Sequence, residues 1–323
     1  MGVPNITDLD EYFSSVIERL KCLRPKEVLS YAIFNEDEET KYYEELARRV
    51  KRDSIKVLFI QMSDESKEHR DRLYRLFKKL YTDEEPVKVD VPPVEVFPYY
   101  SEFEKANDYL EALEYCMKSE LFAKKVYEML ISYAENEDSR GIFSQLALME
   151  RDHYLRIRKA YEFIGGFMDK KKTITELSPG GYLFEDRLKA RYAFLDFLSK
   201  GKGIVFSRKP PEEIRSWMKR NIPVVWITSK AAKNGIITLK PRFIVESPET
   251  LCGDLFQEGY KVVLLESIES LLVEFDEREI AKALMTMKDM AIQNDCYILL
   301  QGEKEAFTPR MWAMLTSEME KLD

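Results

Sequence analysis

Histidine and cysteine are scarce in this chain. Of its 323 residues only two are histidine and four are cysteine, namely Cys22, Cys116, Cys252 and Cys296. No two cysteines form a CxxC pair, which argues against a disulfide framework and against a cysteine-based zinc or iron site. No apolar run is long enough to span a bilayer, and the N-terminus lacks a basic region followed by an apolar segment. We therefore expect a cytoplasmic protein with no membrane partner.

The chain also lacks an excess of positive charge and a phosphate-binding glycine loop. Its net charge is −8 and its isoelectric point is about 5.3, so nothing in the composition attracts nucleic acid. The pattern Gly-x4-Gly-Lys-Ser/Thr is absent, which argues against a P-loop nucleotide site. A charged fraction of 33%, together with few asparagines and glutamines, favours a thermophilic source.

What the first half of the chain does contain is an internal repeat. An offset of 84 residues relates the same three kinds of side chain in two copies: Glu36 to Glu120, Tyr43 to Tyr127, and His69 to His153. Each copy has the pattern of two long amphipathic helices, with the glutamate on the first helix and the histidine on the second. Two helix pairs that each direct a carboxylate and an imidazole inward indicate a metal site inside a four-helix bundle.

Apolar periodicity predicts four long helices, over residues 25–51, 53–81, 102–134 and 138–164. A short helix over 8–22 precedes them, and Gly165-Gly166 is expected to end the last one. Residues 85–100 hold four prolines and should be extended, as a long crossover between the two helix pairs. Short connections within each pair and one long crossover between them are typical of the ferritin-like topology over residues 1–168.

The pattern changes after a linker at 169–180. Short β-like runs at 203–207, 223–228, 261–267 and 296–302 alternate with helix-like stretches near 185–200, 210–220, 248–258 and 276–293. This alternation predicts an α/β domain with a largely parallel sheet over residues 181–323. The domain holds no histidine, so a histidine-based site is not expected there.

Helical periodicity places His69, Glu150 and His153 within apolar stripes, where solvent cannot reach them. Several buried carboxylates must be compensated, and a pair of divalent ions does this. Glu150 and His153 are three residues apart, so both can meet one ion on one helix face. Mixed oxygen and nitrogen ligands suit iron or manganese, with zinc as an alternative. The other interpretation is a bundle core held by ion pairs.

Tyr43 and Tyr127 each follow the repeated glutamate by seven residues, or two helical turns. This spacing places their hydroxyls to donate hydrogen bonds to ligand carboxylates, which would make them part of the catalytic surroundings. The alternative is that both are simply core aromatic residues.

Residues 25–165 resemble the rubrerythrin branch of the ferritin-like family. The matching stretches are NEDEETKYYEELA (35–47), SELFAKKVYEML (119–130) and MERDH (149–153). The resemblance implies a centre of two iron ions that reacts with hydrogen peroxide or dioxygen. We also expect a homodimer.

Two departures from the family pattern matter. Ser66 stands at the repeat position of Glu150, so one carboxylate is missing, and the family's further glutamate on the third long helix is Ala123 here. We predict Glu39 as the fourth carboxylate ligand, with Glu65 as the second choice; the alternative is that Glu39 is a solvated residue at the helix edge. The chain also has no rubredoxin-like CxxC pairs, so peroxide reduction would need a separate electron-donor protein.

Residues 180–320 resemble the archaeal domain of unknown function 835, through GGYLFED (180–186), GIVFSRKPPE (203–212) and VVLLESIESL (262–271). This resemblance implies no chemistry. Arg208 and Glu266 either line a ligand crevice at the carboxyl ends of the strands or form ion pairs at the sheet edge.

The sequence leaves two functions open. The first is an oxidoreductase that detoxifies peroxide under oxidative stress or oxidises Fe(II), with its metals held by Glu36, Glu39, His69, Glu120, Glu150 and His153. The second is a sensor in which the bundle binds iron or responds to oxidant and the α/β domain relays that state to a partner.

Overall fold

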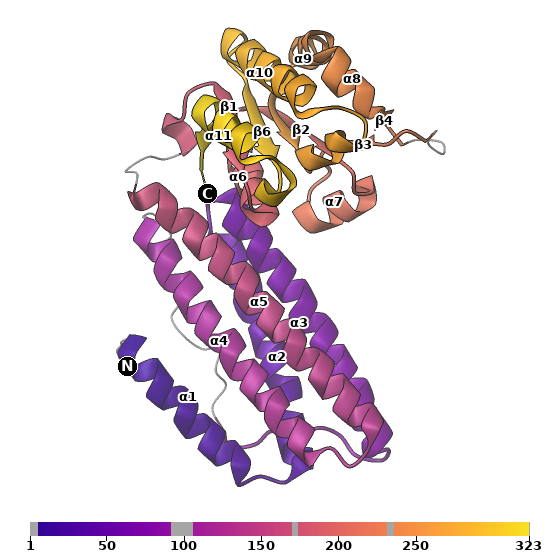
Figure 1. Cartoon of the computed structure of the whole chain (residues 1–323). Helices are drawn as coiled ribbons and strands as arrows, with labels where there is room; N and C mark the ends of the chain where they lie inside the picture. The colour runs from indigo at the N-terminus through magenta and orange to yellow at the C-terminus, as the bar shows by residue number, and fades with distance from the viewer. Residues whose placement is uncertain (1–5, 92–105, 170–173, 231–235, 323) are drawn as a thin grey trace. The chain divides into compact units, whose positions relative to one another are not determined.

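The computed structural model describes residues 6–91, 106–169, 174–230 and 236–322 (Figure 1). The chain divides into two compact units, Met1–Ile164 and Gly165–Asp323. Among the described residues, no helix combines the length and apolar character needed to cross a membrane.

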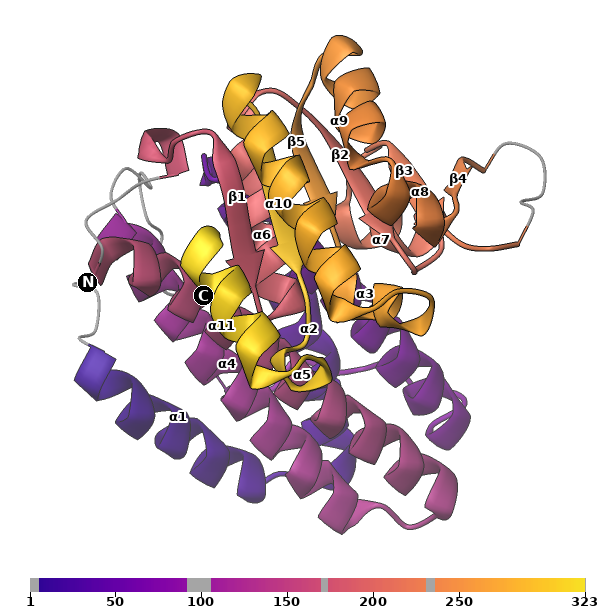
Figure 2. The same ribbon diagram turned by 45° about the horizontal axis from the view of Figure 1, so that its top comes forward.

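The first unit is entirely helical. Its helices are α1 (Ile6–Lys21), α2 (Pro25–Arg49), α3 (Asp53–Leu80), α4 (Ala106–Tyr133) and α5 (Glu137–Asp169). Helices α2 to α5 run side by side in Figures 1 and 2, with α1 beside α4. Pro25 starts α2 at the first helical position, where its missing N–H is not needed. The predicted ferritin-like four-helix bundle with a short N-terminal helix is confirmed.

The end of α5 differs from the prediction. The helix continues through Gly165 and Gly166 to Asp169. Neither glycine has a positive φ, so neither forms the left-handed cap that ends many helices. Of the expected extended segment 85–100, only 85–91 is described, without helix or strand; residues 92–100 lie outside the described residues, as do 102–105 of the predicted third long helix.

The second unit is built on one sheet in the order β4-β3-β2-β5-β6-β1-β7. Its strands are β1 (Gly180–Phe184), β2 (Lys202–Ser207), β3 (Val224–Ile227), β4 (Thr238–Leu239), β5 (Tyr260–Leu265), β6 (Tyr297–Gln301) and β7 (Glu320–Lys321). Every neighbouring pair is parallel, which confirms the predicted α/β fold. The prediction missed β1, β4 and β7, of which the last two are only two residues long.

Helices cover both faces of this sheet (Figure 2). They are α6 (Arg187–Phe197) and α7 (Pro211–Met218) on one face, and α8 (Pro241–Glu246), α9 (Pro248–Gln257), α10 (Glu277–Gln293) and α11 (Pro309–Glu318) on the other. Short 3-10 helices lie at Ile174–Glu176, Leu198–Lys200, Ile268–Val273 and Lys304–Ala306. Because both faces are covered, the central strands are apolar on both sides, as a parallel sheet requires.

Close packing of α6 on the sheet gives a test of this unit. A Cβ on Gly203 would lie 2.4 Å from Leu198 Cδ2 and 2.7 Å from Phe194 Cζ. We expect Gly203→Ala to lower the free energy of unfolding by about 1–3 kcal/mol, because the added methyl overpacks the core. Gly253→Ala, in α9 with nothing within 4 Å, should instead stabilise the unit by about 0.5–1 kcal/mol. Denaturant titration checks both, and an unchanged stability in Gly203→Ala would contradict the packing.

Candidate metal centre

The helix bundle brings five of the predicted ligands together in its core. Glu36 comes from α2, His69 from α3, Glu120 from α4, and Glu150 and His153 from α5; each is at most 1% exposed. They form two groups, Glu36–His69–Glu150 and Glu120–Glu150–His153. Within each group one potential ligand atom per residue lies within 4.8 Å of the others. Glu150 belongs to both groups, so its carboxylate lies where a bridging ligand would lie.

Glu150 is placed between the two imidazoles. Its Oε1 lies 2.9 Å from His69 Nδ1 and its Oε2 lies 3.1 Å from His153 Nδ1. The two rings are nearly parallel, with an interplanar angle of 7° and centroids 5.2 Å apart. The Nδ1 atoms of both histidines therefore face the same carboxylate.

Each of the two repeated tyrosines donates a hydrogen bond to the glutamate of the other copy of the repeat. The Tyr43 hydroxyl donates to Glu120 Oε1, and the Tyr127 hydroxyl donates to Glu36 Oε1. Each tyrosine thus orients the glutamate of the other copy and occupies one of its oxygens. The remaining oxygens face the histidines: Glu120 Oε2 lies 3.1 Å from His153 Nδ1, and Glu36 Oε2 lies 3.6 Å from His69 Nδ1.

Burial and mutual attraction set the protonation of this cluster. Burial raises the pKa of Glu120 to about 7 and also raises the pKa of Glu36. Burial opposes charge on His69 as well, but Glu36 and Glu150 outweigh it and raise the pKa of His69 to about 10. For Glu150 the two imidazoles overcome burial and hold its pKa well below the usual range. Without metal, protons on the imidazoles balance the carboxylates.

Several atoms of the cluster have no hydrogen-bond partner among the described residues, although all are buried. They are Glu36 Oε2, both carboxylate oxygens of Glu150 and both ring nitrogens of His69. The 2.9 Å approach of Glu150 to His69 therefore has ion-pair distance without hydrogen-bond geometry. Leaving a buried polar atom unsatisfied costs about 1–3 kcal/mol. Carboxylate oxygens and imidazole nitrogens in this arrangement fit two divalent ions such as iron, manganese or zinc.

Glu39 lies beside the position of the missing carboxylate. It is 1% exposed, so the alternative of a solvated helix-edge residue is wrong. Its Oε2 lies 3.1 Å from the hydroxyl oxygen of Ser66, which also lies 2.9 Å from the Met62 carbonyl oxygen. Ser66 has a shorter side chain than the glutamate at its repeat position, and the Glu39 carboxylate on α2 extends to the Ser66 hydroxyl.

Glu65 contacts the outer nitrogen of His153. Its Oε2 lies 2.8 Å from His153 Nε2, and Arg156 donates to Glu65 Oε1 at 2.9 Å. Burial opposes charge on Glu65, but His153 and Arg156 lower its pKa well below the usual range. Sequence reasoning did not identify Arg156, although Arg72 at the same offset of 84 residues signals it.

Among the described residues of the α/β unit, one carboxylate is fully buried, that of Glu266, directly after β5. Arg191 donates to it at 2.6 and 3.2 Å, and Ser207 donates at 2.7 Å. Glu266 therefore forms its ion pair with Arg191, next to a strand in the middle of the sheet. We expected either a ligand crevice lined by Arg208 and Glu266 or ion pairs at the sheet edge. Arg208 instead donates to the Ile227 carbonyl oxygen. Glu266 is satisfied within the chain.

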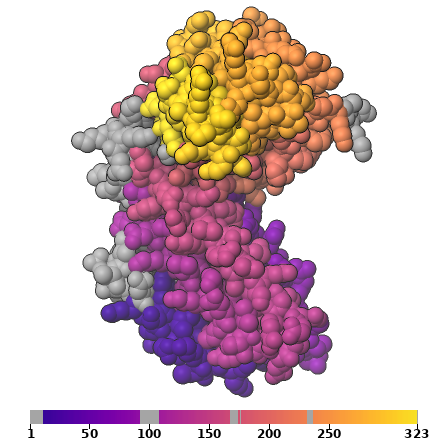
Figure 3. Space-filling model, viewed as in Figure 1, coloured from indigo at the N-terminus to yellow at the C-terminus, as the bar shows by residue number. Residues whose placement is uncertain are grey.

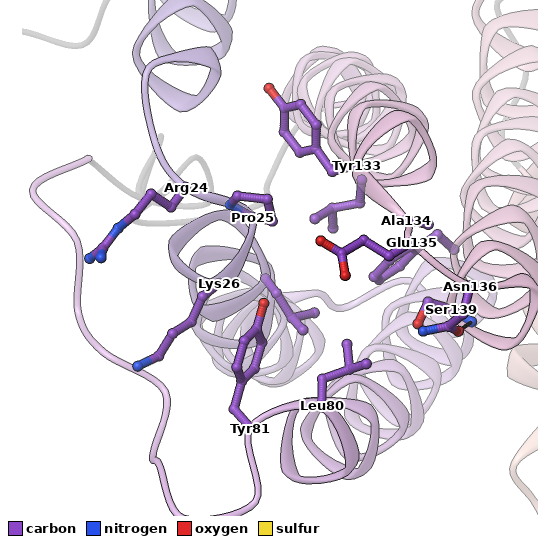
Figure 4. Close-up of a pocket in the computed structure, with 13 residues that line it drawn as sticks. Arg24, Pro25, Lys26, Leu80, Tyr81, Tyr133, Ala134, Glu135, Asn136 and Ser139 are labelled. Carbon is purple, nitrogen blue, oxygen red and sulfur yellow. Dashed lines mark hydrogen bonds between the residues drawn. The ribbon is translucent and has the colours of Figure 1, made fainter.

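A pocket of about 390 Å³ lies at one end of the bundle, lined by the first residues of α2 and α5 and the last of α3 and α4. Figure 4 shows the Glu135 carboxylate between the rings of Tyr81 and Tyr133, with Arg24 directed away. Ser139, in its wall, is eleven residues from Glu150 along α5, about 16 Å. The pocket is thus separate from the Glu–His cluster. Side chains of α4 and α5 close the face of the bundle seen in Figure 3.

Comparisons with known proteins match each half of the chain. Residues 27–177 match the family model for rubrerythrin, and residues 184–319 match that for a protein of unknown function, DUF835. Both resemblances inferred from the sequence are confirmed, and no curated protein matches the chain. A solved structure of a hypothetical protein from Pyrococcus furiosus is 26% identical over 49% of this chain and 98% of that one, with a TM-score of 0.44.

The raised pKa of His69 predicts how the metal-free bundle responds to pH. In the unfolded chain this histidine titrates near its ordinary value of 6.5, and in the folded bundle at about 10. Its protonated form therefore stabilises the fold fully below pH 6.5, and this contribution is lost as pH rises to 10. We expect the melting temperature of metal-free protein to fall over that range.

Metal-loaded protein is the control for this prediction. A bound cation replaces the proton charge, so its melting temperature should fall less between pH 6.5 and 10. Calorimetry of both forms checks the difference. A melting temperature of the metal-free protein that stays level or rises over this range would contradict the assignment.

Proposed function

We propose that this chain, a rubrerythrin-type bundle joined to a DUF835 unit, holds two iron ions and reacts with hydrogen peroxide or dioxygen as a peroxidase or ferroxidase. Manganese and zinc are alternative occupants. The observation that carries the proposal is the pair of buried Glu–His groups sharing Glu150, in which several carboxylate oxygens and ring nitrogens have no hydrogen-bond partner among the described residues. Ion pairing at these distances leaves the atoms without hydrogen bonds, which costs stability, whereas bound cations would satisfy them.

The proposed ligands divide into two positions. Glu36 and His69 would hold one ion and Glu120 and His153 the other, with Glu150 available to both. Glu39 is the fourth carboxylate, near Ser66. Bound iron would supply the electrons and the Lewis acidity for oxygen–oxygen bond cleavage.

The protein side chains orient the centre and manage its protons. The Tyr43 and Tyr127 hydroxyls fix one oxygen each of Glu120 and Glu36, which leaves the other oxygen for an ion. Burial raises the pKa of both tyrosines well above the usual range, so each keeps its proton on the hydroxyl. The imidazole protons leave when metal binds, because a ligand nitrogen needs its lone pair.

The source of electrons separates the two reactions. Reduction of peroxide to water consumes two electrons in each turnover, and the CxxC pairs of a rubredoxin-like centre are absent from this sequence. A separate electron-donor protein would have to supply them. Oxidation of Fe(II) as a substrate needs no such donor, because the electrons come from the iron itself.

A sensor is the second candidate. Ser66 replaces one ligand carboxylate with a neutral hydroxyl, and this favours a centre that differs from the usual four-carboxylate set. In that case the bundle would register iron or oxidant and the DUF835 unit would pass the state to a partner.

Stopped-flow spectroscopy separates the candidates. Protein loaded anaerobically with two equivalents of Fe(II) is mixed with peroxide or with dioxygen, with and without a reductant. An enzyme oxidises its iron rapidly and turns over repeatedly, whereas a sensor shows one slow oxidation. If protein purified without added metal carries none and binds no Fe(II), the proposed function is wrong.

The assignment of Glu39 has its own test. We expect Glu39→Gln to weaken one of the two metal positions about tenfold and to slow oxidation, because an amide brings no negative charge. Glu38→Gln is the matched control: Glu38 is exposed and pairs with Lys41, so its loss should change neither quantity. Metal titration and oxidation rates measure both variants. Wild-type affinity and rate in Glu39→Gln would sink the assignment.

A further inference from the structure

The surroundings of the two histidines are not equivalent, although the repeat places the rings alike. His153 Nε2 lies 2.8 Å from Glu65 Oε2. Arg156 holds this carboxylate in place through both of its oxygens. The outer nitrogen of His153 therefore has a charged acceptor of fixed position.

The repeat gives His69 a different neighbourhood. Met149 stands at the position equivalent to Glu65, and Arg72 at that of Arg156. The Arg72 guanidinium lies 3.5 Å from the Met149 sulfur and donates a hydrogen bond to Gln145 Oε1 at 2.6 Å. His69 Nε2 is buried and has no hydrogen-bond partner among the described residues.

This difference affects how well each ring can bind a metal ion. A carboxylate at Nε2 holds the ring proton there, which keeps the Nδ1 lone pair directed into the site and makes that nitrogen more basic. Among the described residues nothing accepts a proton from His69 Nε2, so no outer partner holds the tautomer or the orientation of this ring. Loss of such an outer partner typically lowers metal affinity 10- to 100-fold.

The number of carboxylates around each metal position does not explain a difference in affinity between the two positions. Each position has one glutamate of its own, Glu36 or Glu120, and shares Glu150. The additional carboxylate, Glu39, lies by Ser66 on the helices α2 and α3, which carry Glu36 and His69. Ser66 stands at the repeat position of the shared Glu150, so the number of carboxylates favours neither position, and the difference lies in the outer contacts of the two histidines.

We propose that the two metal positions fill in order, the His153 position first, and that Glu65, held by Arg156, is the positioning residue that sets this order. The inference rests on the proposed function, since it concerns the same two positions. Its consequence is a stable one-ion form of the protein, in which the His69 position exchanges its ion with solution.

Titration of the metal-free full chain with Co(II) tests the order, since the visible absorption of Co(II) reports each occupied position and a competing chelator sets the affinity scale. For wild type we expect the first ion to bind at least tenfold more tightly than the second. His69→Ala should keep the tight ion, and His153→Ala should lose it.

Exchanging the outer residues gives the sharper test. Glu65→Met copies the other half of the repeat and should weaken the first ion about 10- to 100-fold. Met149→Glu places a carboxylate near Arg72 and should strengthen the second ion. Glu68→Gln, an exposed glutamate on the same helix, removes the same charge and should change neither affinity.

The outcomes separate this inference from the proposed function. If wild type binds no Co(II), both are wrong. If two ions bind with equal affinity, if His69→Ala loses the tight ion, or if Glu65→Met leaves the first affinity unchanged, the filling order is overturned while the two-ion centre stands.

Discussion

The bundle depends on how it compensates one buried carboxylate, Glu150, at the centre of four helices. Its two oxygens lie between two imidazoles, and no solvent reaches any of the three groups. Moving such charges out of water costs several kcal/mol each unless opposite charge is close. Protons on the histidines provide that charge in the metal-free state, and two cations would provide it when bound. The apolar stripes bring the helices together, but this cluster decides what can occupy the core.

The α/β unit solves the same problem differently. Glu266 is as deeply buried as Glu150, yet Arg191 and Ser207 satisfy both of its oxygens, and the Arg191 guanidinium packs 5.0 Å from the Trp217 ring centroid. Three hydrogen bonds donated from within its own unit hold this carboxylate in place. Both units bury a carboxylate, but among the described residues only the bundle has buried carboxylate oxygens without a hydrogen-bond partner.

Much of this arrangement could be predicted from sequence, because helical spacing converts directly into which residues share a face. The repeat predicted the bundle and identified Glu36, His69, Glu120 and His153, and the three-residue spacing to His153 added Glu150. Spacing alone does not say which helix faces which, so the crossed bonds from Tyr43 and Tyr127 to the glutamates of the opposite copy needed the structure. The partner of Glu266 was missed for the same reason, since Arg191 reaches it from a helix 75 residues away in sequence. Gly165 and Gly166 were misread because glycine ends a helix only where the backbone turns left-handed.

The two copies of the repeat have the same residue at some equivalent positions and different residues at others. Glutamate, tyrosine and histidine recur in both, and they form the two Glu–His groups with their orienting hydroxyls. The differences come in matched sets: Ser66 opposite Glu150 is accompanied by Glu39 opposite Ala123, so the carboxylate that one helix lacks comes from its neighbour. Glu65 has no carboxylate at its repeat position, which is Met149. Arg72 contacts the Met149 thioether, whereas Arg156 contacts the Glu65 carboxylate. The repeat therefore keeps the charged groups of the core alike in both copies, while the contacts behind the two histidines differ.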